Sequence, residues 1–145
     1  MQTHRGCKYA NISRDYSVED LAAFHGHLGP YIVLGYRIGR YIRSTFCGDP
    51  FRLTATVHCS GSPPDSCIVD GVQIGSGCTL GKGNIRVVAG DRLCCEFSAD
   101  GRRILVTPRP FAAPERGDDY DLMIEELAEQ LYTMPDGTLF DAEEV

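Results

Sequence analysis

The chain has 145 residues and a formal net charge of −6, and no run of Lys and Arg is longer than two. This charge argues against nucleic acid as the main partner. No apolar stretch approaches the length of a membrane span and no signal-peptide core follows the N-terminus, so we expect a cytoplasmic protein without a membrane partner. The length fits a single domain, residues 1–145.

The seven cysteines are an odd number, and no two have the spacing of a zinc-finger pair. Reduced thiols are therefore expected rather than a disulfide framework. Cys78, Cys94 and Cys95 are expected to be small buried hydrophobes. Cys94 and Cys95 are consecutive on a strand, so they point to opposite faces and are not expected to bind one ion together.

Helical patterns organise the first third of the chain. Ser17 and Asp20 have the spacing of a capping box, which predicts a short helix that Gly26 ends. Pro30 suits the first turn of a second helix, in which apolar residues recur at three- and four-residue steps to about residue 44.

Two glycines of this second helix predict a close helical neighbour. Gly35 and Gly39 lie one turn apart, and a helical glycine costs about 1 kcal/mol relative to alanine. Such a pair allows another backbone to approach closely. A last helix, opening at Asp118 and Asp119, has a continuous apolar face. Together these features favour a homodimer.

The remaining elements alternate between strands and one further helix. Residues 51–59 alternate apolar and polar side chains, and Pro63 predicts a helix start that leads to a stop at Gly75. Three strand patterns follow, joined by short turns that are typical of antiparallel neighbours. We expect them to share one sheet with residues 51–59 and to bury the second helix; they cover residues 85–88, 93–97 and 103–107.

The soft metal-ligand candidates form two groups. His25 and His27 lie on the loop before Pro30, and imidazole and thiolate are the donors that zinc prefers. Cys67 lies near a helix start and is the thiolate expected to join them. The second group contains His58, Cys59, Cys78 and Cys67 itself, and a role in the core is the open alternative for these residues.

A glycine-rich loop forms a further candidate site at residues 77–84. Lys82 and Asn84, with the backbone N–H groups of this loop, have the composition of an anion or substrate cradle. The spacing is not that of a Walker motif. A simple turn that leads into a strand is the alternative.

Two of these motifs resemble those of the formylmethanofuran dehydrogenase FmdE family. The first is HGHLGP at residues 25–30, followed by GYRIG at 35–39. The second is CIVDGVQ at residues 67–73, followed by GCTLGKGN at 77–84. The resemblance covers roughly residues 17–110. It implies an α+β core with a five-stranded mixed β-sheet flanked by α-helices, thioredoxin-like in outline.

The resemblance also implies a site. It assigns His25, His27 and Cys67 as ligands of zinc or another divalent transition metal, and Cys67 and Asp70 as catalytic residues. It implies a metal-binding protein of anaerobic one-carbon and redox metabolism, with a molybdenum or tungsten oxidoreductase as partner. The alternatives are a non-catalytic metal or sulfur chaperone for such an enzyme, and a purely structural component of it.

The chain differs from many relatives in two ways. They carry a cysteine where this chain has Gly29, so we expect an open coordination position here. Some relatives append a C-terminal zinc finger, and this chain lacks the cysteines for one. It is therefore expected to be a core-domain-only member.

Overall fold

The computed structural model describes residue 4 and residues 6–145 of the chain. Strands and helices follow the expected order for most of the sequence. The strands are β1 (Thr54–Cys59), β2 (Ile85–Ala89), β3 (Cys94–Ala99), β4 (Arg102–Pro108) and β5 (Phe140–Glu144). The helices are α1 (Val18–His25), α2 (Pro30–Thr45), α3 (Ile68–Ser76), α4 (Tyr120–Thr133) and α5 (Asp136–Leu139), with a 3₁₀ turn η1 (Asp65–Cys67) before α3.

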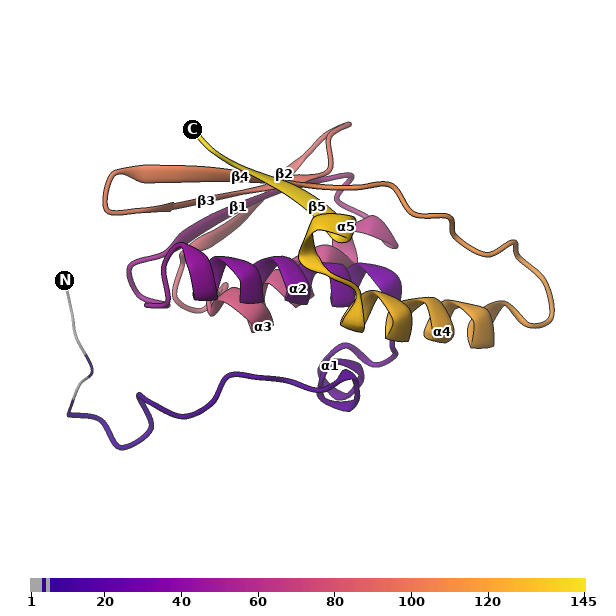
Figure 1. Ribbon diagram of the computed structural model, residues 1–145, viewed down its shortest axis with the longest axis horizontal. Helices are drawn as coiled ribbons and strands as arrows, with labels where there is room; N and C mark the ends of the chain where they lie inside the picture. Colours follow the sequence, from indigo (N-terminus) through magenta and orange to yellow (C-terminus); the bar gives the residue numbers. More distant parts are fainter. Residues whose placement is uncertain (1–3, 5) are drawn as a thin grey trace.

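The five strands form one mixed sheet in the order β2-β1-β3-β4-β5. Helices α2 and α3 lie against one face of this sheet, and α1 lies on their far side (Figure 1). The core fills the space between the sheet and α2, where Ile32, Tyr36 and Phe97 are among the largest buried side chains. The expected α+β class with a five-stranded mixed sheet is thus confirmed.

Within the described part of the chain, no helix has the length and hydropathy to cross a membrane.

The strand order corrects one expectation. β2 and β3 are consecutive in sequence but are not neighbours, because β1 lies between them, parallel to β2 and antiparallel to β3. The connection from β1 to β2 runs through α3, and such a crossover joins parallel strands. β2 is also the more exposed strand: only Ile85 is buried in it, whereas Ala55, Val57 and Cys59 of β1 are fully buried. The apolar strand therefore takes the inner position.

The acidic tail contributes the fifth strand, which its sequence pattern did not predict. Phe140 is its one buried residue, and the four that follow are exposed. β5 pairs antiparallel with β4 and is held at the edge of the sheet by the ion pairs Arg102–Glu144 and Arg109–Asp141. An edge strand with one apolar residue has no period-two signal that would distinguish it from a polar tail.

The start of α3 differs from the expected helix start at Pro63. The chain first makes the 3₁₀ turn η1, and α3 begins at Ile68. The Asp65 carboxylate accepts a hydrogen bond from the Ser60 backbone N–H at 2.9 Å, so it holds the preceding loop instead of capping a helix from Ser62. The stop expected at Gly75 lies two residues later, at Gly77, which is the left-handed cap of α3 at φ 84°.

Glycines bring α2 and α3 into backbone contact. A Cβ atom added to Gly35 would lie 2.1 Å from the Ile68 carbonyl oxygen, and one added to Gly71 would lie 2.0 Å from the Ile32 carbonyl oxygen. Gly39 is in the same position against Gly75 and its neighbours. The close neighbour that Gly35 and Gly39 predict is therefore α3 of the same chain. These two glycines no longer support a homodimer.

The glycine contact gives a direct stability prediction. We expect Gly71→Ala to lower the free energy of unfolding by about 1–3 kcal/mol or more, because the new methyl group meets backbone that no rotamer change relieves. Gly137→Ala in α5 is the matched control, since an added Cβ there has no heavy atom within 4 Å. Urea denaturation followed by circular dichroism measures both. Equal stability of the two variants would contradict the packing described here.

Candidate functional site

The histidine loop is shaped by the residues that end α1 and begin α2. The capping box of Ser17 and Asp20 starts α1 as expected, and Gly26 ends it in a left-handed conformation at φ 101°. His25 is the last residue of α1, and His27 lies on the loop that follows. Pro30 then opens α2. The two imidazoles therefore come from a helix end and a loop, and their ring centroids lie 5.0 Å apart.

His25 is paired with a carboxylate from α3. Its Nδ1 lies 2.6 Å from Oδ2 of Asp70, and the His25 side chain is only 12% exposed. Nε2 of His25 makes no hydrogen bond with the described residues. A carboxylate on one ring nitrogen fixes the tautomer and orientation of the imidazole, which leaves the other nitrogen available as a base or a metal ligand. Asp70 is thus a partner of His25. The spacing of residues in the sequence could not predict this pair, because the two residues lie 45 positions apart.

His27 is exposed and rests against the loop backbone at Gly29. A Cβ atom added to Gly29 would lie 3.0 Å from Cε1 and 3.6 Å from Nδ1 of His27. The backbone of Gly29 is extended, at φ −136° and ψ 168°, which any residue adopts. A side chain at this position would therefore point at the His27 imidazole.

Cys67 lies at the junction of η1 and α3 and is half-buried. Burial, then the carboxylates of Asp70 and Asp65, raise the pKa of its thiol. The free thiol is therefore protonated at neutral pH. Asp70 connects the two predicted ligands, because its charge acts on Cys67 while its oxygen binds His25.

The predicted metal ligands lie in one region but do not form a closed cage. In residues 4 and 6–145, no group of three or more His, Cys, Asp or Glu side chains is arranged to hold a metal ion. His25 and His27 are the pair that the structure brings together. Whether Cys67 joins them in binding an ion remains a prediction.

A cavity of about 570 Å³ adjoins His27. Its walls come from the histidine loop, from Pro64 before η1, and from α4 and the segment that precedes it. Tyr31 and Phe111 pack in it with ring centroids 5.3 Å apart. Burial and the Asp65 carboxylate raise the pKa of Tyr31. The cavity is within the range of sizes that bind small organic molecules.

Sequence reasoning missed the α4 side of this cavity. Phe111, Arg116 and Tyr120 line it although they lie far beyond His27 in the chain. The Arg116 guanidinium sits over the Tyr120 ring at 4.1 Å. No motif marks these residues, and their place beside the histidine loop depends on long-range packing such as that of Phe111 on Tyr31.

The glycine-rich loop is held by its own hydrogen bonds. The Asn84 amide donates to the carbonyls of Pro50 and Leu53 at 2.7 and 3.1 Å and accepts from the Thr79 N–H at 2.9 Å. Asn84 thus has a structural role. The Lys82 ammonium donates to the Thr79 hydroxyl at 2.9 Å and remains exposed on the surface. Binding of an anion by Lys82 and Asn84 remains a prediction.

The second group of soft ligands is dispersed. His58 and Cys59 point to opposite faces of the sheet: His58 contacts Arg92 at 3.2 Å and Glu96 at 3.7 Å, while Cys59 is fully buried in the core. Cys78 is also buried, and burial raises its pKa to about 11. The burial expected for the three core thiols is confirmed, with Cys78, Cys94 and Cys95 at most 4% exposed.

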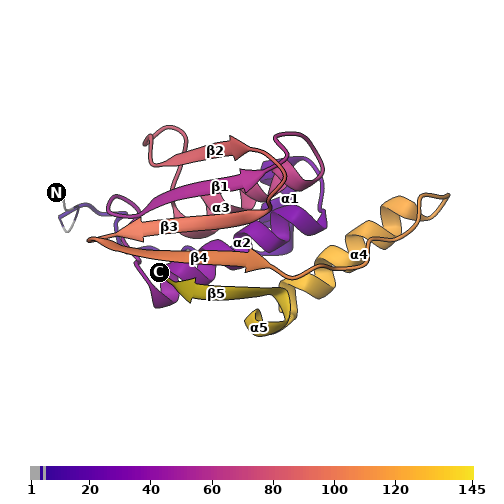
Figure 2. The same cartoon turned by 90° about the horizontal axis from the view of Figure 1, so that it is seen from above.

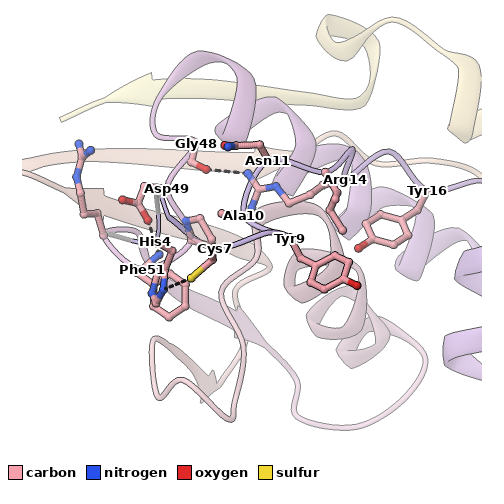
Figure 3. A pocket seen from close by; sticks show the side chains of 13 residues that line it. His4, Cys7, Tyr9, Ala10, Asn11, Arg14, Tyr16, Gly48, Asp49 and Phe51 are labelled. Atoms are coloured by element: carbon pink, nitrogen blue, oxygen red, sulfur yellow. Dashed lines mark hydrogen bonds between the residues drawn. The ribbon is translucent and has the colours of Figure 1, made fainter. Parts of the chain in front are cut away.

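A cavity of about 680 Å³ lies away from the histidine loop, under the N-terminal segment. His4, Cys7 and Tyr9 cover the turn at Asp49 to Arg52 there (Figure 3). Sγ of Cys7 lies 3.8 Å from Nδ1 of His4. These two residues stand apart from His25 and His27 and belong to no predicted site.

One known family covers all the residues of the candidate site. A family model described as "FmdE, Molybdenum formylmethanofuran dehydrogenase operon" matches residues 24–141. The matched region includes His25, His27, Cys67 and Asp70, and extends through α4 into β5. No curated protein matches the chain.

The electrostatics of Cys67 can be tested by alkylation of the metal-free protein. Asp70→Asn removes a charge that raises the thiol pKa, so the thiolate fraction at pH 8 rises and Cys67 should react with iodoacetamide a few-fold faster. Mass spectrometry of the modified peptides gives the rate relative to exposed Cys7. Asp91→Asn, on an exposed turn, should leave that ratio unchanged. An unchanged ratio in Asp70→Asn would refute the coupling.

Proposed function

This chain belongs to the FmdE family, and on that premise we propose that His25 and His27 bind a transition-metal ion, with zinc as the first candidate. The ion would serve an enzyme of anaerobic one-carbon and redox metabolism, in keeping with the relation of the family to formylmethanofuran dehydrogenase. The chain supplies the core domain of this family over residues 24–141.

The observation that supports the proposal most directly is the His25–Asp70 pair at 2.6 Å. Histidines that bind metals usually donate their second ring nitrogen to a carboxylate or carbonyl, and this contact raises the basicity of the ligating nitrogen. Asp70 occupies that role from a helix that backbone contacts hold rigidly against α2. His27 is the second donor, with its ring 5.0 Å from that of His25.

Cys67 is the proposed third ligand. Its thiol must lose a proton to bind, and its raised pKa makes this loss unfavourable without a cation nearby. Binding of the ion would therefore release a proton and depend on pH. Asp70 binds the His25 imidazole, and its negative charge also acts on the Cys67 thiol. Its carboxylate would therefore orient the imidazole and partly neutralise the charge of the ion.

A metal in such a site supplies a Lewis acid that polarises a carbonyl group or activates water. The chain itself supplies the surroundings. Nε2 of His25 would hold the ion while Asp70 holds the Nδ1 side of the ring, and Tyr31 and Phe111 form a partly apolar wall beside His27. The adjoining cavity gives a substrate access to the histidines, which favours an enzyme over a closed structural site.

A second candidate function is a metal or sulfur chaperone without turnover. It is favoured by the exposure of His27 and by the lack of a three-ligand group among the described residues. Few and exposed ligands suit an ion that is passed to another protein. Rapid transfer of zinc to a chelator, without any hydrolytic or redox activity, would favour this candidate.

We also propose that the chain assembles, either as a homodimer or with a molybdenum or tungsten oxidoreductase. Helix α4 extends beyond the end of the sheet (Figure 2). Its inner face packs on the core through Ala128 and Leu131, while Leu122 and Met123 are 60% and 45% exposed. Exposed apolar side chains on a projecting helix are typical of an interface. A sedimentation mass near 15.9 kDa at micromolar protein would contradict the homodimer.

Zinc binding tests the proposed site. His25→Ala and Cys67→Ala should abolish stoichiometric zinc, measured by equilibrium dialysis and atomic absorption, while circular dichroism shows an unchanged fold. His58→Ala is the control and should bind like the unmodified chain. Binding should weaken below about pH 6, because imidazole and thiol donors must lose their protons. Full zinc binding by His25→Ala would disprove the site.

Gly29 offers a gain-of-function test. Gly29→Cys introduces a thiol whose Cβ points at the His27 imidazole, in a backbone conformation that accepts a side chain. The added thiolate should tighten zinc binding roughly tenfold or more. Gly29→Ala is the matched control and should bind zinc as the unmodified chain does. Equal affinities of the two variants would show that position 29 does not face the ion.

A further inference from the structure

A groove on the other side of α1 is not used by the proposed metal site. It lies between α1, α3 and the glycine-rich loop, and its volume is about 810 Å³. Phe24, Ile74 and Leu80 line it with apolar surface. Phe24 is 61% and Leu80 is 79% exposed, so the described part of the chain leaves both uncovered. Two large exposed apolar side chains on one concave surface indicate a binding site.

Two cations line the same groove. Arg14 and Lys82 form no ion pair with a carboxylate in residues 4 and 6–145. Nη2 of Arg14 donates to the Gly48 carbonyl at 2.7 Å (Figure 3), while Nη1 is buried against Gly77 without a hydrogen-bond partner among the described residues. Burial and the neighbouring Arg43 lower the pKa of Arg14. Asp49 acts in the opposite direction, but no carboxylate of the described residues forms an ion pair with Arg14.

The two acidic residues of the groove differ in their partners. Asp15 binds Arg43 at 3.0 Å, whereas Asp20 accepts only the neutral Ser17 backbone N–H in the capping box of α1. Lys82 has a neutral partner, the Thr79 hydroxyl. Among the charged side chains that line the groove, two cations stand against one carboxylate without a cationic partner, although the chain as a whole carries −6. An anion would find two cations here and little competing negative charge.

We propose that this groove binds a small organic anion. Its apolar or aromatic body would lie against Phe24 and Leu80, and its carboxylate, sulfonate or phosphate group would lie at Arg14 and Lys82. The proposal goes beyond the metal site, since nothing in the groove requires a bound ion. In this proposal Lys82 attracts the anion by its charge. The side-chain amide of Asn84 does not bind the anion, because it is engaged in the hydrogen bonds that hold the loop.

The groove also adjoins the histidine site. Phe24 directly precedes His25 on α1, and Ile74 follows Asp70 by one turn on the same side of α3. Neither His25 nor Asp70 itself lines the groove. Binding in the groove and binding of zinc can be measured separately, so failure of one does not decide the other.

The test uses two aromatic probes of similar shape on the full chain in the presence of a chelator. Anilinonaphthalene sulfonate carries the anionic group, and N-phenyl-1-naphthylamine has the same ring system without it. Fluorescence titration should show one sulfonate per chain. The neutral probe should bind about tenfold more weakly, because it lacks the charge-assisted contact.

Single variants then locate the probe. Arg14→Gln and Lys82→Gln should each weaken sulfonate binding several-fold and leave the neutral probe unchanged, whereas Leu80→Ala should weaken both probes. Arg86→Gln on β2 and Leu122→Ala on α4 remove an exposed cation and an exposed apolar side chain elsewhere, and should have no effect. Near-UV circular dichroism checks that each variant is folded.

Three outcomes would overturn the proposal. The first is the absence of stoichiometric sulfonate binding up to about 1 mM, a concentration that corresponds to only about 4 kcal/mol of affinity. The second is equal affinity for the two probes. The third is loss of binding in the control variants to the same extent as in Lys82→Gln, which would place the probe on another surface of the chain.

Discussion

The backbone contact between α2 and α3 is the constraint on which the rest of the molecule depends. Gly35 and Gly71 face the carbonyl groups of the opposing helix at distances that no side chain permits. This contact fixes the position of α3 relative to the helix that follows the histidine loop. Since α3 carries Asp70 and α1 carries His25, the distance between those two side chains is set by packing that lies outside the site itself.

The same contact also explains why the site is rigid on one side and open on the other. His25 is held by a carboxylate from a packed helix, whereas His27 lies on an exposed loop between two glycines. Cys67 is the last residue of η1 and directly precedes α3, so it lies where the chain changes from a 3₁₀ turn to an α-helix. A fixed base beside adaptable donors is an arrangement that can accept an ion without being preassembled around it.

Local patterns in the sequence were sufficient for most helices and for the histidine loop. The capping box at Ser17, the stop at Gly26 and the start at Pro30 all depend on residues within one turn, so spacing alone predicted them. The placement of β2 at the edge of the sheet could not be obtained in this way. The position of β2 depends on how much apolar surface each strand buries. Only a comparison of all the strands of the sheet gives this order.

The candidate site divides in the same manner. Residue types and loop context indicated His25, His27 and Cys67, and the family resemblance added Asp70. The 2.6 Å contact between His25 and Asp70 joins residues 45 positions apart, and no periodicity reports such a contact. The aromatic wall contributed by Phe111 was equally inaccessible, because it depends on a strand, β5, whose sequence is acidic and almost without apolar residues.

The position of α4 in the topology has a consequence for how the family can diversify. β4 and β5 are adjacent antiparallel strands, so everything from Arg109 to Leu139 is an excursion between two partners of one ladder. Such a segment can change in length, sequence or assembly partner while the register of the sheet stays the same. The outer turn of α4, which lines the cavity beside His27, is therefore freer to vary than the inner turns, where Ala128 and Leu131 pack on the core.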